Sequence, residues 1–150
     1  GIGEGLSIGE LIVADNLAYQ DVDNRVFNYY YGQIPQMPAS YHVKDKWLNT
    51  LVQSAENIFD VKVGQIVTGD SFISSKDQIA KIKNYFPKAL VTEMEGAAVA
   101  QTCYQFGVPS LVVRCVSDVA DEQASVDFDE FIKEAGKKSA QFVLQWLKDL

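Results

Sequence analysis

The sequence predicts an α/β domain in which helices cover both faces of a largely parallel β-sheet. Two features predict this class. Short apolar runs typical of strands alternate with segments whose apolar residues recur at helical spacing, as in consecutive βαβ units. These runs are apolar throughout, which is typical of parallel strands buried on both faces. Because the chain has 150 residues, 47% of them apolar, residues 1–150 are expected to form a single domain with one compact core.

The first half of the chain contains two predicted strands and one predicted helix. Residues 10–15, ELIVAD, are typical of a short buried strand. The aromatic, proline-bearing stretch at residues 18–41 is too irregular for a regular element. Apolar residues recur at helical spacing over residues 44–59. The run VKVGQIVTGD, residues 61–70, then predicts a strand that ends in a Gly-Asp turn.

The second predicted helix has both a start and a stop signal. Ser75 is followed three residues later by Gln78, which is the spacing of a capping box. The helix is expected to reach Phe86, because Pro87 cannot continue it.

The alternation of strands and helices continues to the end of the chain. Residues 88–94 predict a strand, residues 95–106 an alanine-rich helix and residues 110–118 a further strand. Asp127 and Glu130 are expected to form an acidic cap on a long amphipathic helix that follows.

Composition excludes several classes of function. The net charge of −7 argues against a nucleic-acid partner. The chain is expected to have no signal peptide, and no apolar run in it reaches the roughly 20 residues that cross a bilayer. Cys103 and Cys115 lack metal or redox spacing and are expected to be reduced core thiols of a cytoplasmic protein. The single histidine, His42, argues against a histidine metal site or a catalytic triad.

Charged and aromatic residues stand where the predicted strands end, although burying an acid costs desolvation free energy. Phe72 follows one strand, Glu95 follows the next, and Arg114 and Asp118 lie at the end of the third. Parallel strands place their carboxyl ends at one edge of a sheet, and open α/β sheets bind ligands at that edge. These residues are therefore expected to line one site.

Each of these residues also has a structural explanation. Glu93 and Glu95 suit the first turn of a helix, where the helix dipole stabilises an acid, and Asp118 suits a turn or a helix N-cap. Phe72 suits the core. The small residues after Glu95 would let another surface approach it closely. Arg114 lies inside an apolar strand and needs an acidic partner, for which Glu95 is the candidate.

Several local motifs resemble one protein family. They are DVDNRVFNYYYG, GQIPQMPA, GDSFI, TEMEGAAVAQ, VPSLVVRCVSDVAD and FDEFI, and they occur here in the order and spacing of that family. The sequence resembles the purine nucleosidase and phosphorylase superfamily, and most closely the 5′-methylthioadenosine/S-adenosylhomocysteine nucleosidases, over nearly all 150 residues. The resemblance implies a three-layer α/β/α fold with a central mixed, largely parallel sheet.

The resemblance also implies an activity, which is hydrolysis of the N-glycosidic bond of both nucleosides in methionine salvage, without a metal or organic cofactor. Asp118 would protonate the adenine ring as the bond breaks, which suits a leaving purine that gains negative charge. Met94 and Glu95 would hold the ribose, and Arg114 would orient the glutamate. A carboxylate at this place also stabilises an oxocarbenium-like ribose.

The remaining contacts implied by the resemblance concern the base and the 5′ substituent. Phe72 would stack on the base, the Ile73 backbone would hydrogen-bond its edge, and Phe128 would border the 5′-alkylthio pocket. In a homodimer, three residues of the partner subunit would cover that pocket, namely Phe27, Tyr29 and Pro35. An apolar pocket of this kind would separate the family from ordinary nucleoside phosphorylases.

The chain departs from the family at its start. The family begins with further βα units that carry a glutamate activating the attacking water, whereas this sequence begins at Gly1, just past them. Its opening glycines follow no strand and so are no dinucleotide fingerprint. The chain is therefore expected to be the C-terminal portion of the family fold, with Asp121 as a possible substitute for the glutamate. Two alternatives stay open: a related purine nucleoside phosphorylase or futalosine hydrolase, and an inactive fragment of the nucleosidase.

Overall fold

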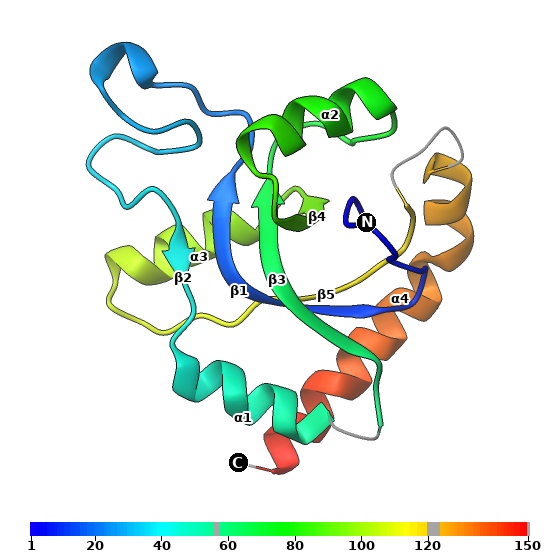
Figure 1. The fold of residues 1–150 in the computed structure, drawn as a ribbon. Helices are drawn as coiled ribbons and strands as arrows, with labels where there is room; N and C mark the ends of the chain where they lie inside the picture. The colour runs from blue at the N-terminus through cyan, green and yellow to red at the C-terminus, as the bar shows by residue number, and fades with distance from the viewer. Residues whose placement is uncertain (56–57, 120–123, 150) are drawn as a thin grey trace.

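A computed structural model describes residues 1–55, 58–119 and 124–149, and it has the predicted α/β architecture (Figure 1). The strands of its mixed sheet are β1 (Leu11–Tyr19), β2 (Tyr41–His42), β3 (Val61–Thr68), β4 (Ala89–Glu93) and β5 (Val113–Cys115). The helices of the described residues are η1 (Arg25–Phe27), α1 (Asp45–Ala55), α2 (Lys76–Tyr85), α3 (Gly96–Gln105) and α4 (Ala124–Lys148). The predicted fold class is confirmed.

The direction of the last strand differs from the prediction. β3 lies between β1 and β4 and is parallel to both, as expected. β5 instead pairs antiparallel with β1, with Ile12 opposite Arg114, and β2 pairs antiparallel with the same strand further along. The parallel rule for βαβ units concerns strands joined within one parallel sheet segment. The prediction assumed that β5 would be added next to β4, but β5 pairs with β1, on the edge of that strand that faces away from β3 and β4.

The first strand is longer than its sequence pattern predicts. β1 continues past the expected end at Asp15 to Tyr19. Its pairing with β3 shifts register between Ala14 and Leu17, as at a β-bulge. Asp15 and Asn16 lie at this irregularity, so the apolar run is interrupted in the sequence while the strand continues.

The core lies on both faces of the sheet. Ile12, Ala14 and Leu17 of β1 pack in a cluster that includes Ala97 and Ala100 of α3. Residues of alternate register face the other side, as strand geometry requires. There Leu11 and Val13 pack with α1 and α4, and Ala18 packs with α2 and the residue that follows it. The partners are Leu51, Ala55, Phe142 and Ile82 in the helices and Phe86 at the end of α2. One layer of helices therefore covers each face (Figure 1).

The structure confirms the predicted start and end of α3 to within one residue but not the predicted start of α4. The helix expected at residues 95–106 is observed as Gly96–Gln105. The acidic cap expected at Asp127 is wrong, because α4 begins at Ala124 and Asp127 lies inside its first turn. None of the helices in the described residues is long and apolar enough to span a membrane.

The capping box at the start of α2 is observed and carries a testable prediction. The Ser75 hydroxyl accepts a hydrogen bond from the Gln78 backbone N–H at 3.3 Å, and the Gln78 side chain accepts one from the Ser74 N–H at 3.0 Å. Replacing Ser75 with alanine should lower the free energy of unfolding by about 1 kcal/mol, measured by urea denaturation. Ser54→Ala is the control, since that hydroxyl bonds to a carbonyl inside α1 and its loss should change stability little.

Glu10 makes stability depend on pH. Hydrogen bonds from the Lys62 ammonium and the Ser7 backbone N–H lower the pKa of this buried carboxyl below its ordinary value of 4.5. A lowered folded-state pKa adds stability above the unfolded pKa and loses it as pH falls through the folded pKa. Glu10→Gln should therefore cost about 1 kcal/mol at neutral pH and lose less stability than the wild type on acidification below 4.5.

Urea denaturation at pH 7 and at decreasing acidic pH values checks this prediction. Glu130→Gln, at an exposed position of α4, is the control and should keep the acid dependence of the wild type. An unchanged acid dependence in Glu10→Gln would contradict the assignment to Glu10.

Candidate active site

A cavity of about 250 Å³ lies where β3 and β4 end and where the chain leaves β5. Its volume is close to the lower end of the roughly 300–1,000 Å³ that small-molecule sites occupy. Six residues predicted from the sequence line it, namely Phe72, Ile73, Met94, Glu95, Arg114 and Asp118. The structure therefore brings together residues that are up to 46 positions apart in the sequence (118 − 72).

These residues do not meet by the route that the sequence suggested. β5 is antiparallel to β1 and therefore runs in the direction opposite to that of β3 and β4. Asp118 lines the cavity from the segment that follows β5. Arg114 instead pairs with Ile12 and shares its side of the sheet, the side covered by α3. The Arg114 side chain lies on this face and reaches the end of β4.

The partner of Arg114 is a pair of carboxylates. Its Nη2 donates to Glu95 at 2.8 Å, as expected, and also to Glu93. The Glu93 side chain is 10% exposed and that of Glu95 is 65% exposed. The buried ion pair is thus made with Glu93, while Glu95 extends toward the cavity with its charge partly neutralised by the same guanidinium.

Glu93 also caps the helix that follows it. The expected place in the first turn of the helix is wrong, because Glu93 is the last residue of β4 and α3 begins at Gly96. Its carboxylate nevertheless accepts from the Gly96 N–H at 2.8 and 2.9 Å, at the end of the helix where the dipole favours an acid. A β-carbon at Gly96 would lie 2.8 Å from Leu17 and 3.0 Å from the Glu93 carboxylate. The small residue after Glu95 is therefore required for the close approach of β1 and of Glu93.

Asp118 is buried at the cavity wall, with 9% of its surface exposed. Its backbone carbonyl accepts from the Gly1 nitrogen at 2.5 Å, and the Ser117 hydroxyl donates to its carboxylate at 2.9 Å. An N-cap role is excluded, because α4 begins at Ala124.

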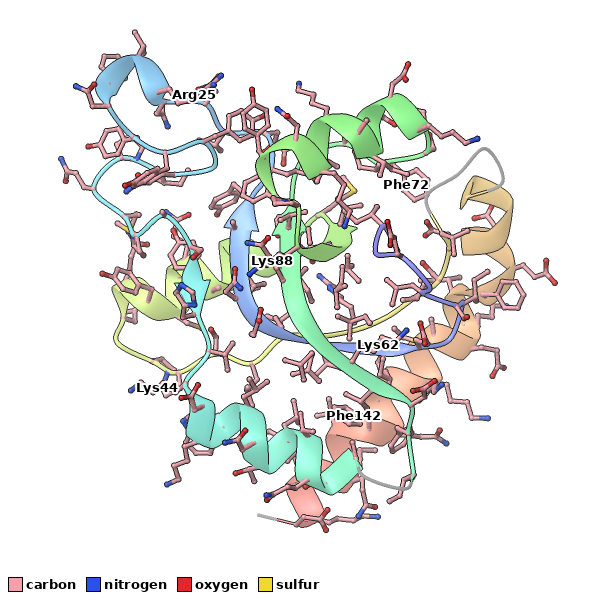
Figure 2. All side chains as sticks on the ribbon, in the orientation of Figure 1. Arg25, Lys44, Lys62, Phe72, Lys88 and Phe142 are labelled. Atoms are coloured by element: carbon pink, nitrogen blue, oxygen red, sulfur yellow. The ribbon has the colours of Figure 1, made fainter. Side chains whose placement is uncertain are left out.

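The turn after β3 and Met94 supply one apolar side of the cavity. Phe72 is 43% exposed, so the alternative that it belongs to the core is wrong. Figure 2 shows Phe72 near the start of the chain, below α2, and Gly1 lines the same cavity. Ile73 is buried in the core cluster that α2 covers, and it holds the turn in place. Met94 is 45% exposed and completes this side.

Cys115 lines the cavity too, without a partner in a disulfide. Burial raises the pKa of its thiol. At neutral pH it is therefore a protonated thiol and a poor nucleophile.

Three of the predicted residues lie away from this cavity. Phe27 in η1 is 69% exposed, Pro35 is exposed and Tyr29 is half-buried, all in the loop that projects beyond β1 (Figure 1). The loop is anchored by Arg25 (Figure 2), whose guanidinium lies 5.3 Å from the rings of Tyr31 and Tyr85. These residues do not contribute to the cavity of their own chain.

Two further predicted residues cannot be placed. Phe128 belongs to α4, but its side chain lies outside the described residues, and Asp121 lies outside them entirely. No group of histidine, cysteine, aspartate or glutamate able to hold a metal ion occurs within residues 1–55, 58–119 and 124–149.

Sequence reasoning missed several residues of the site. Thr68 donates a hydrogen bond to Glu93, Glu93 accepts one from Arg114, and Ser117 donates one to Asp118. Ile132 and Ala135 of α4 form one wall. The alternation along β3 and β4 offered a signal for Thr68 and Glu93, because polar residues that share a face with buried Ile66 and Val91 need polar partners.

A family model and a curated relative both match nearly the whole chain. A family model described as the phosphorylase superfamily matches residues 1–148. The 5′-methylthioadenosine/S-adenosylhomocysteine nucleosidase of Staphylococcus haemolyticus is 44% identical over 151 residues, which are 99% of this chain and 66% of that protein. The chain thus spans about two thirds of the length of this relative.

Solved structures agree. The S-adenosylhomocysteine nucleosidase of Streptococcus pyogenes, in complex with 5-methylthiotubericidin, superposes with a TM-score of 0.96 at 42% identity, covering 99% of this chain and 64% of that one. The futalosine hydrolase of Helicobacter pylori superposes with a TM-score of 0.92 at 35% identity, covering 99% of this chain and 64% of that one.

Proposed function

Because this chain belongs to the phosphorylase superfamily, we propose that it carries a nucleosidase site for 5′-methylthioadenosine and S-adenosylhomocysteine. The reaction is hydrolysis of the N-glycosidic bond, which releases adenine and a 5-thio-ribose. One observation carries the proposal: Phe72, Glu95 and Asp118 surround one cavity of about 250 Å³. The names of the relatives in Staphylococcus and Streptococcus support the same substrates.

The geometry suggests a role for each group in the reaction. Phe72 presents an exposed ring to the cavity, where it stacks on the purine, and the Ile73 backbone meets the purine edge. Asp118 protonates the purine ring as the bonding electrons of the N-glycosidic bond move to it. The ribose then carries positive charge, which the Glu95 carboxylate stabilises. A water molecule from solvent adds to C1′ to form the new C–O bond, and the proton that it loses restores the acid form of Asp118.

The ribose and the 5′ substituent have separate places in this proposal. Glu95 accepts hydrogen bonds from the ribose hydroxyls, Met94 packs against the sugar, and Arg114 holds the glutamate at 2.8 Å. Phe128 borders the 5′-alkylthio group. The assignment requires no metal or organic cofactor for the proton transfer, because a carboxylic acid supplies it.

A homodimer completes the site in this proposal. Val26, Phe27 and Tyr30 are 82%, 69% and 75% exposed, and exposed apolar groups of this kind mark association surfaces. Phe27, Tyr29 and Pro35 of one subunit then cover the 5′ pocket of its partner. Phe27→Asp should shift the sedimentation coefficient of the protein toward that of the monomer. It should also weaken the binding of methylthioadenosine more than the binding of adenine. Equal sedimentation of variant and wild type would contradict this arrangement.

The proposed setting is methionine salvage in the cytoplasm, with a small thionucleoside as the partner and neither nucleic acid nor membrane involved. The net charge of −7 and the free thiols of Cys103 and Cys115 support this setting.

The proposal is tested by incubating the chain with methylthioadenosine and measuring the released adenine by chromatography. The proposal predicts release without phosphate. Dependence on phosphate, with inosine as a substrate, would favour a purine nucleoside phosphorylase.

A futalosine hydrolase is the second candidate, favoured by the superposition on the Helicobacter pylori enzyme. Comparing the rates at which the chain cleaves futalosine and methylthioadenosine distinguishes the two candidates. Preferential cleavage of futalosine would overturn the first assignment.

A further inference from the structure

Thr68, the last residue of β3, is 2% exposed and lies behind the cavity without lining it. Its hydroxyl accepts a hydrogen bond from the Ala97 backbone N–H at 2.8 Å and donates one to Oε1 of Glu93. A hydroxyl has one proton to give. Because Ala97 is a donor, that proton is directed to Glu93.

The Glu93 carboxylate is held from several sides. The Gly96 N–H donates to both of its oxygens, the Glu95 N–H donates to Oε2 at 3.2 Å, and Arg114 donates to Oε2 as well. Thr68 donates to the other oxygen. The carboxylate therefore has a defined rotation, with Oε2 turned toward Arg114.

The same nitrogen of Arg114, Nη2, contacts both Glu93 and Glu95. Glu95 is on the exposed side of the cluster and Glu93 on the buried side. The place of Glu95 at the cavity is thus linked through Arg114 to the buried carboxylate, and through it to Thr68.

We propose that Thr68 is a positioning residue for the ribose-binding groups, acting through Glu93 and Arg114 on Glu95; this inference rests on the proposed function of the site. Thr68 does not touch the ligand. Its hydroxyl fixes the rotation of the Glu93 carboxylate, which fixes the guanidinium that holds Glu95.

A purely structural role makes a different prediction. Thr68 also caps α3 through Ala97, so Thr68→Val should lower the thermal stability of the protein in either case. If Thr68 only caps α3, Thr68→Val should lower the affinity for all ligands of the cavity by the same factor. If Thr68 is a positioning residue, Thr68→Val should weaken the binding of ligands that carry ribose hydroxyls and leave the binding of adenine unchanged.

Calorimetric titration of the full chain with methylthioadenosine and with adenine separates the two roles. Thr68→Val should lower the affinity for methylthioadenosine about tenfold, the effect of one lost hydrogen bond. The affinity for adenine should stay within about twofold of the wild-type value. Thr68→Ser keeps the hydroxyl and should restore binding. Thr102→Val is the matched control, because this hydroxyl bonds to the Ala98 carbonyl on the exposed side of α3; it should leave both affinities unchanged.

A double variant tests the route. In an Arg114→Met background, Thr68→Val should cause no further loss of methylthioadenosine affinity, because the link to Glu95 is already broken. Equal losses for both ligands, additive losses in the double variant, or failure of serine to restore binding would each overturn the inference.

A ligand-free measurement keeps the inference separate from the proposed function. If the wild type binds neither ligand, the proposed function fails, and nitrogen-15 spectra of the Arg114 guanidinium then decide the inference. A guanidinium signal that broadens in Thr68→Val and returns in Thr68→Ser supports the positioning role. A signal unchanged in Thr68→Val refutes it.

Discussion

Replacing Asp118 with asparagine is expected to lower the rate of adenine release from methylthioadenosine about 10²–10⁴-fold, the usual contribution of a general acid. The amide keeps the size of the side chain and can still accept from Ser117, but it has no acidic proton to give to the leaving purine. The affinity for the nucleoside should change much less than the rate, because the lost proton transfer occurs in the transition state. Single-turnover measurements of adenine release check the rate, and equilibrium titration checks the affinity.

Asp129→Asn is the control for this experiment, since Asp129 is exposed on α4 and is not among the residues that line the cavity. It should release adenine at the wild-type rate. An Asp118→Asn variant as fast as the wild type would show that another group protonates the purine.

Replacing Phe142 with alanine is expected to lower the free energy of unfolding by about 3–5 kcal/mol, as for other buried aromatic residues. Phe142 is 1% exposed and packs α4 against Leu11 and Val13 of β1 and against Leu51 of α1, on one face of the sheet. Its ring meets Phe59 edge-on, with the ring centroids 5.4 Å apart. The loss is a large share of the roughly 5–15 kcal/mol that stabilises a domain. Urea denaturation measures it.

The loss should also reach the site, because α4 supplies Ile132 and Ala135 to the cavity wall. Leu144→Ala is the control on the same helix: this side chain is 58% exposed, and its loss should change stability by less than about 0.5 kcal/mol. Equal effects of the two substitutions would contradict the packing of α4 described here.

Local signals in the sequence predicted the elements whose pattern is set by near neighbours. The capping box at Ser75 and the helix at residues 95–106 were found because caps and small-residue helices are local features. The strand at residues 110–118 was found too, but its direction was not. Direction depends on pairing with Leu11–Val13, about a hundred residues earlier, and no local pattern records that pairing.

The candidate site was predicted in part for the same reason. Arg114 inside an apolar strand required an acid, and Glu95 is indeed one of its partners. The more buried partner, Glu93, was assigned only to the helix dipole, because its contact with Thr68 depends on the register of β3 and β4. A sequence pattern shows that a charge needs a partner, and only the folded chain shows which partner is buried with it.

Titration of this chain with methylthioadenosine, with adenine release followed in the same sample, tests the central claim most directly. The wild type should bind with saturation and release adenine without phosphate, whereas Asp118→Asn should bind and release adenine much more slowly. A chain that is folded, as judged by its urea transition, and that neither binds methylthioadenosine nor releases adenine would contradict the assignment of the cavity as a thionucleoside site.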